Sequence, residues 1–200
     1  MAISMFMNME VLSLTVSQEN IELMTETNMQ ATASMDVIDN FAFINNVKHG
    51  FICITMLITY IESVLNTILR DDLKRTDDWL LQKMSIEDKF EIIYIFYRKD
   101  LAKLKESNEW GVFKNCKALR NTLIHYKTNE LGYAGRSPQW RYGTMIISES
   151  FTKPKMQKLH DTIMKFISIF ISELGLAINP TAEMIDSDGA SDIVGYIYNP

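Results

Sequence analysis

The spacing of apolar residues along the chain predicts long helices. Between residues 51 and 69, apolar side chains recur every three to four positions, which is the period of one helix face (Ile54, Leu57, Ile61, Leu65, Ile68). Three later segments repeat this period, and we expect a helix over residues 86–105, another over 110–126 and a last one over 155–174. Helices are therefore the main elements expected in this chain.

Capping residues mark the ends of several of these segments. Ser85 followed by Asp88 has the form of a capping box and indicates a helix start at residue 86. Residues 107–109 interrupt the apolar period. Pro154 suits the first turn of the last helix, and Gly175 suits its end.

The pattern is weaker outside these helices. Residues 11–16 alternate as a short strand would, and either Asn20 or Ser17 is a candidate cap for a helix that follows. Residues 132–148 contain three Gly and one Pro, and they predict either a long loop or a small hairpin ending near residue 147. Residues 193–198 are a candidate late strand.

Composition supports a helical fold. The 200 residues include 8 Gly and 4 Pro, which is few for an all-β protein that needs frequent turns. We expect an all-α helical bundle of about four to six helices with a small β insert. The expected organisation is an N-terminal extension over residues 1–48, a helical domain over 49–178 with a loop insert at 131–150, and an acidic tail over 179–200.

The net charge of -5 is distributed unevenly. Residues 111–165 carry ten basic and three acidic side chains, whereas residues 1–50 and 166–200 each have a net charge of -5. A basic segment in an acidic protein offers a local site for a polyanion. A solvated helical surface shows the same pattern, so charge alone does not decide between the two.

Cysteine and histidine content narrows the chemistry. Cys53 and Cys116 lie in apolar, helical contexts, so we expect buried free thiols, with one disulfide or a reactive thiol as the alternative. Two Cys and three His without ligand spacing argue against zinc. We therefore expect no metal and no cofactor.

The apolar runs and the N-terminus bear on location. The two most apolar runs, 51–61 and 166–178, are shorter than the ~20 residues that a membrane-spanning helix needs. The first residues lack the basic region of a signal peptide. We expect a soluble, cytoplasmic protein with no membrane partner.

One segment near the end of the predicted 110–126 helix carries residues suited to phosphate chemistry. Asn121 and His125 are four residues apart and share a helix face, and the long side chain of Arg120 can reach the same ligand. Arg offers a fixed charge and a fork for phosphate oxygens, and His gains or loses a proton near neutral pH. In the alternative interpretation, Arg120 pairs with an acid such as Glu62, and His125 caps the helix C-terminus.

These residues resemble the motif of the HEPN family, the higher eukaryotes and prokaryotes nucleotide-binding domains. The family motif is Arg, then four to six residues, then His, often with Asn directly after the Arg. Arg120, Asn121 and His125 match its four-residue form.

Two earlier segments extend the resemblance. Glu62 and Asn66, one helical turn apart, resemble the family's earlier helix, which carries polar residues facing the active site. Residues 84–89 resemble a segment that opens the next helix. The resemblance covers roughly residues 50–175 and implies a HEPN-like bundle.

The resemblance implies a metal-independent endoribonuclease, in which the RNA's own 2′-OH attacks the phosphate and leaves a 2′,3′-cyclic phosphate. It implies that His125 acts as general acid or base, that Arg120 stabilises charge on the phosphate, and that Asn121 orients His125 or the phosphate. The remaining assigned residues are Glu62 and Asn66 as supports, and Lys117, Tyr126 and Lys127 as substrate-binding groups.

The resemblance also implies partners. Family members commonly join two motifs across a two-fold interface, so we expect RNA as substrate and a homodimer as the assembly. Many bacterial members are toxins or abortive-infection factors in antiviral defence, which makes an antitoxin or defence-system protein a candidate partner. Two alternatives stay open: a catalytically inactive HEPN-like dimer that binds RNA, a nucleotide or a protein, and a helical interaction protein whose Met and aromatic residues are core.

Overall fold

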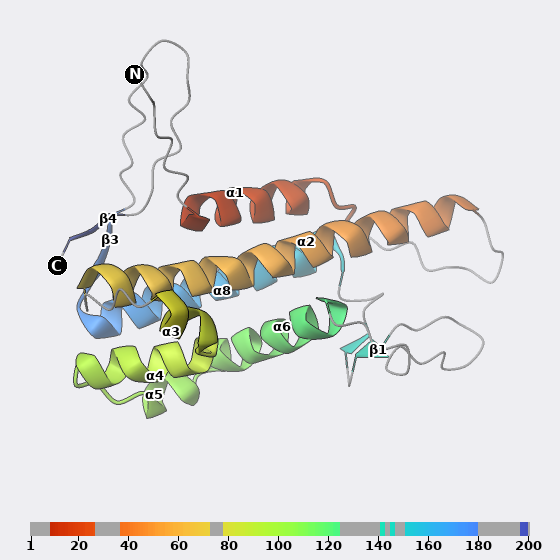
Figure 1. Ribbon diagram of the computed structural model, residues 1–200. Helices are drawn as coiled ribbons and strands as arrows, with labels where there is room; N and C mark the ends of the chain where they lie inside the picture. The colour runs from red at the N-terminus through yellow and green to blue at the C-terminus, as the bar shows by residue number, and fades with distance from the viewer. Residues whose placement is uncertain are drawn as a thin grey trace, which may run out of the picture. The chain divides into compact units, whose positions relative to one another are not determined.

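The computed structural model describes residues 9–26, 37–72, 78–124, 141–142, 145–146, 151–179 and 197–199. Helices dominate these residues, so the predicted all-α fold is confirmed. The helices are α1 (Met9–Glu22), α2 (Val37–Thr67), the π-helix η1 (Ile68–Asp72), α3 (Asp78–Lys83), α4 (Ile86–Phe96), α5 (Ala102–Lys105), α6 (Asn108–Ile124) and α8 (Lys153–Leu174) (Figure 1).

Two short antiparallel strand pairs complete the described elements. β1 (Arg141–Tyr142) pairs with β2 (Met145–Ile146), so the small hairpin expected inside the 131–150 insert is present. β3 (Ala177–Asn179) pairs with β4 (Ile197–Asn199), which overlaps the candidate strand at 193–198.

The chain divides into two compact units, each assembled from separate segments. Unit 1 consists of Met1–Thr15, Thr59–Gly111 and Met164–Pro200, and unit 2 consists of Val16–Ile58 and Val112–Ile163. Four helices, α1, α2, α6 and α8, contribute residues to both units. The boundary expected between residues 48 and 49 falls inside α2.

Unit 1 has an aromatic core. The ring of Phe90 on α4 lies 4.9 Å from the ring of Phe170, 5.5 Å from Phe166 and 5.4 Å from Trp110, measured between centroids. Tyr94, one turn after Phe90, stacks on Phe170 at 6.0 Å. Edge-to-face and stacked pairs of this kind add to the free energy gained by burying the rings.

Polar groups are also buried in unit 1, and each contact joins two elements. Lys89 on α4 is 1% exposed, and its ammonium donates to Glu62 Oε1 on α2 at 2.6 Å. Thr67 on α2 donates to Oε1 of the buried Glu10 on α1 at 2.5 Å. The Tyr94 hydroxyl donates to Glu173 on α8.

Unit 2 brings α2 and α6 together at two thiols. Cys53 and Cys116 are free and buried, as predicted, and burial raises the pKa of each to about 12. Within this unit α6 runs in the opposite direction to α2 (Figure 1).

Gly50 allows the buried ring of Phe151 to lie against α2, since a Cβ there would be 2.3 Å from the ring.

The N-terminal prediction is wrong. Residues 11–16 belong to helix α1 instead of a strand, and both candidate caps, Ser17 and Asn20, lie within that helix instead of at its start. The reason is that α1 turns polar residues inward: Glu10, Ser13, Ser17 and Asn20 are all buried. Their spacing of three to four is helical, but it is carried by polar side chains, which the apolar pattern does not register.

The predicted 86–105 helix is interrupted. Its start is confirmed, because Ser85 and Asp88 form both bonds of a capping box. It ends at Phe96, and Arg98 adopts a left-handed backbone with φ 52°. α5 then begins at Ala102, whose N–H donates to Asp100. This break and the additional α1 and α3 raise the number of described α-helices above the expected four to six.

The other helix ends differ less from expectation. α2 begins 14 residues before residue 51, and α6 begins at Asn108. α8 begins at Lys153 and ends before Gly175, which has φ 74° and donates to Ser172 O, so both predicted end signals are confirmed.

One stretch, Asn45–Arg70, is long and apolar enough to span a membrane by length and composition. It is longer than the uninterrupted apolar run at 51–61 because isolated polar residues do not end the helix. Of its most apolar window, 56% is buried inside the protein, and the core helix of a soluble protein meets the same test. The cytoplasmic location remains a prediction.

Candidate functional site

The last turn of α6 carries two of the three motif residues. Phe113, Cys116 and Leu119 are spaced by three and face the core of unit 2. Arg120 and Asn121 follow directly, so the helix places them at the edge of the buried face, where both are half-buried. They are held by a packed helix, and each side chain still reaches solvent.

The side chains of Arg120 and Asn121 have no polar partner among the described residues. Within the described residues, the side chains of Arg120 and Asn121 form no hydrogen bond, and the Arg120 guanidinium forms no ion pair. A half-buried guanidinium and a neighbouring amide can together offer several N–H donors to an anion. Lys117, one turn before Asn121 on the same face, is also half-buried and adds a positive charge.

The remaining residues of the motif region follow the end of α6. His125, Tyr126 and Lys127 lie outside the described residues, and the helix ends at Ile124, whose side chain is exposed. The general acid or base and two substrate-binding groups therefore stay predictions.

The two supporting residues belong to the other unit. Glu62 and Asn66 lie on the part of α2 that is in unit 1, and the Glu62 carboxylate is paired with Lys89. A Glu62–Arg120 contact is not among the described ion pairs. Asn66 Oδ1 is buried and has no hydrogen-bond partner in the described part of the chain.

Lys89 is the residue that sequence reasoning missed. It lies between Ile86 and Ile93 at helical spacing, on the same face as the buried Phe90. A lysine on the apolar face of a predicted helix signals a buried charge that needs a partner. The half-exposed Glu62, at 39%, supplies that partner.

Charge differs between the units. Unit 2 carries ten basic and eight acidic residues, and unit 1 carries ten basic and seventeen acidic residues. The described lysines of unit 2 on α6 and α8 include exposed ones, Lys114, Lys155 and Lys158. The basic character predicted for residues 111–165 thus belongs mostly to the unit that contains Arg120.

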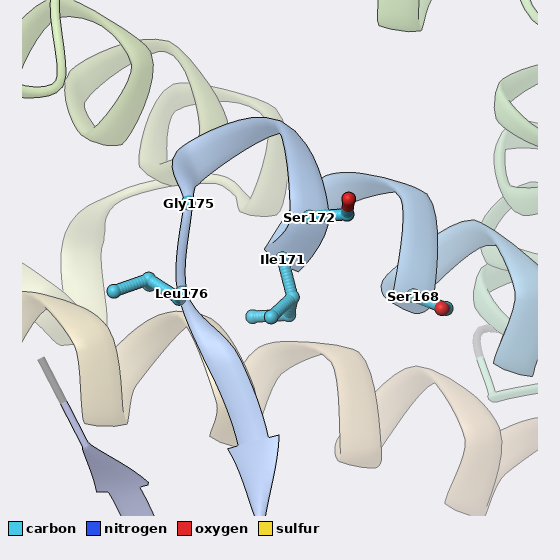
Figure 2. A pocket seen from close by; sticks show the side chains of 5 residues that line it. All are labelled: Ser168, Ile171, Ser172, Gly175 and Leu176. Atoms are coloured by element: carbon cyan, nitrogen blue, oxygen red, sulfur yellow. The ribbon is translucent and has the colours of Figure 1, made fainter.

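A shallow hollow lies elsewhere, at the C-terminal end of α8 in unit 1. Figure 2 shows the residues that line it: Ser168, Ile171, Ser172, Gly175 and Leu176. None of the predicted site residues lines this hollow. In the described part of the chain, no group of three or more His, Cys, Asp or Glu side chains is placed to hold a metal ion.

In comparisons with protein-family models, with curated proteins and with solved structures, no match to this chain was found. The HEPN resemblance therefore rests on the residues themselves, and it is a hypothesis for experiment.

Proposed function

We propose that this protein is a metal-independent endoribonuclease whose site is built on the last turn of α6. The 2′-OH of the RNA attacks the adjacent phosphorus, the bond from phosphorus to the 5′-oxygen breaks, and the products are a 2′,3′-cyclic phosphate and a 5′-OH. The proton leaves the 2′-OH and another is delivered to the 5′-oxygen. His125 carries out one of these transfers.

The observation that carries this proposal is the state of Arg120 and Asn121. The two side chains lie next to each other on one helical turn, and both reach solvent. Neither side chain has a hydrogen-bond or ion-pair partner among the described residues. Burying a guanidinium without a partner is unfavourable, so its half-exposed position suits an anionic ligand. Asn121 lies one turn from position 125 on the same face, and it can orient His125 or the phosphate.

A homodimer belongs to this proposal. One motif supplies one guanidinium and one imidazole, whereas the two proton transfers and the phosphate charge call for more groups. A two-fold axis near the end of α6 doubles them. An antitoxin or another defence-system protein is the proposed regulator, since an unrestrained ribonuclease would harm its own cell.

The test is cleavage of a fluorescent single-stranded RNA in EDTA. His125→Ala and Arg120→Ala should each lower the rate by about 10²–10⁴-fold, and Asn121→Ala should lower it less. His160→Ala and Lys158→Ala are matched controls on α8 in the same unit and should leave the rate unchanged. A 2′-deoxy substitution at the cleaved position should block the reaction, and mass spectrometry should find the cyclic phosphate.

Two outcomes would reject ribonuclease activity. If the wild type cleaves nothing, or if His125→Ala cleaves at the wild-type rate, the motif does not catalyse. RNA or nucleotide binding that persists without cleavage, and weakens in Arg120→Ala, would support the catalytically inactive dimer. The overall charge of -5 is the observation that favours this second candidate.

A further inference from the structure

His49 on α2 is a buried histidine between two asparagines in unit 2. It is 8% exposed. Its Nδ1 lies 2.7 Å from Oδ1 of Asn20 on α1, and its Nε2 lies 3.1 Å from Oδ1 of Asn45, one turn earlier on α2. Both ring nitrogens therefore face amide oxygens.

The orientation of each amide is fixed by its other end. Asn20 Nδ2 donates to the carbonyl of Val16 at 2.8 Å, and Asn45 Nδ2 donates to the carbonyl of Leu23 at 3.1 Å. Rotating either amide by half a turn would place its oxygen against a carbonyl oxygen. Each amide thus presents its only acceptor to the imidazole.

These contacts form a continuous chain of hydrogen bonds, and the hydrogens that the chain needs can be counted. Four contacts run from Val16 O through Asn20, His49 and Asn45 to Leu23 O, and each needs one hydrogen. The two amides supply the outer two, so the ring must supply both inner ones. A neutral imidazole carries one N–H, and an imidazolium carries two.

We propose that His49 is a proton-dependent joint between α1 and α2, in which a proton on the ring completes the hydrogen-bond chain and strengthens the hold of Asn45 on the end of α1. With the ring neutral, one of the four contacts lacks a hydrogen. The shorter contact to Asn20 keeps the N–H on Nδ1, so the shortage falls on Asn45. Asn45 then either faces a lone pair on Nε2 or turns and gives up Leu23 O.

Other forces on the ring oppose the proton. Burial, and next the positive charge of Lys48, lower the pKa of His49. The acids that α1 contributes to unit 2 are Glu19 and Glu22, both exposed, and Glu22 is paired with Lys153 of α8 at 2.8 Å. The Cys53 thiol, one turn along α2, stays neutral because its pKa is about 12.

The balance of these effects determines whether His49 is protonated at a given pH. At neutral pH the ring is neutral, the chain is one hydrogen short and the joint is at its weakest. As the pH falls through the pKa of His49, the proton completes the chain. By linkage, the free energy by which protonation strengthens the Asn45 contacts equals the free energy by which those contacts favour protonation of His49.

The test is a ¹⁵N NMR titration of the histidines in wild type, Asn45→Leu and Asn45→Asp. Loss of the second acceptor should lower the pKa of His49 by about 1–2 units, the value of one hydrogen bond to a charged group, and a carboxylate should raise it. His160, on α8 in the same unit, is the internal control and should not shift.

The wild type alone gives a second readout that needs no variant. Above its pKa, His49 should carry its hydrogen on Nδ1, and below it both nitrogens should show hydrogen-bonded N–H signals. A neutral ring with the hydrogen on Nε2, a ring that stays neutral to pH 4, or the same pKa in wild type and Asn45→Leu would each overturn the proposal.

Discussion

The two units of this protein are held together by different chemistry. In unit 1, three aromatic rings, those of Trp110, Phe166 and Phe170, pack around Phe90, and the buried Lys89 on α4 is paired with Glu62 on α2. In unit 2, a chain of amide and imidazole contacts joins α1 to α2, and Asn46 alone makes three contacts to Thr25. Both units bury apolar residues, but unit 1 adds a cluster of aromatic rings, whereas unit 2 adds directional hydrogen bonds between α1 and α2.

This difference has a consequence for specificity. Aromatic burial is favourable in several ring orientations, whereas a hydrogen bond weakens steeply when its angle changes. Unit 2 should therefore tolerate displacement of α1 poorly, although each contact contributes little. Unit 2 also carries the proposed site residues at the end of α6, where defined positions matter.

The largest expected effect on stability tests the interior of unit 1. Phe90→Ala removes a fully buried ring with three aromatic neighbours, and it should lower the free energy of unfolding by about 3–5 kcal/mol. Asn46→Ala in unit 2 leaves Thr25 N–H without its acceptor and should cost about 1–3 kcal/mol. Urea denaturation measures both, and an equal loss would contradict the contrast between the units.

Two helical glycines give a smaller and sharper comparison. Gly50→Ala in unit 2 places a methyl group 2.3 Å from Phe151, whose buried ring must move, and overpacking of this kind costs about 1–3 kcal/mol. Gly111→Ala in unit 1 meets nothing within 4 Å and should raise stability by about 1 kcal/mol through helix propensity. Thermal unfolding should shift in opposite directions, and a stabilised Gly50→Ala would show that Phe151 is loosely packed.

The smallest expected effect concerns one ion pair in each unit. Hydrogen bonding to Lys153 lowers the pKa of Glu22, and hydrogen bonding to Lys165 lowers that of Glu109. A lowered pKa contributes stability above the ordinary carboxyl pKa, and this is lost as the pH falls through the folded-state value. Glu109→Gln should cost more than Glu22→Gln at pH 7, because their side chains are 13% and 59% exposed.

Salt and acid provide the controls for this pair of variants. Both differences from wild type should shrink at high salt and vanish below the folded pKa values. A difference that persists in acid would have a cause other than the ion pair.

The elements that could be predicted are those whose apolar residues alone carry the helical period. Residues 155–174 and the capping box at Ser85 are of this kind, and both were found as expected. α1 could not be predicted because its buried face is polar and is stabilised by contacts with α2. The break after Phe96 depends on the left-handed backbone of Arg98, and Arg has no marked preference for that conformation.

The position of two candidate site residues was predictable for a similar reason. Spacing along one helix is local information, and it correctly placed Arg120 and Asn121 side by side at a helix end. The partner of Glu62 is determined by tertiary packing. Helix periodicity predicts which face a residue lies on, but it does not predict which element packs against that face. Lys89, 27 residues away, is the partner that the fold supplies.

The discontinuity of the two units has a consequence for synthesis on the ribosome. Neither unit is complete until α8 has been made, since unit 2 requires residues up to Ile163 and unit 1 requires those after it. At roughly 5–20 residues per second, the 26-residue apolar stretch Asn45–Arg70 waits on the order of 5–20 s for its covering partners. The nascent chain should therefore be a client of ribosome-associated chaperones, and slowing translation between α6 and α8 should increase its aggregation.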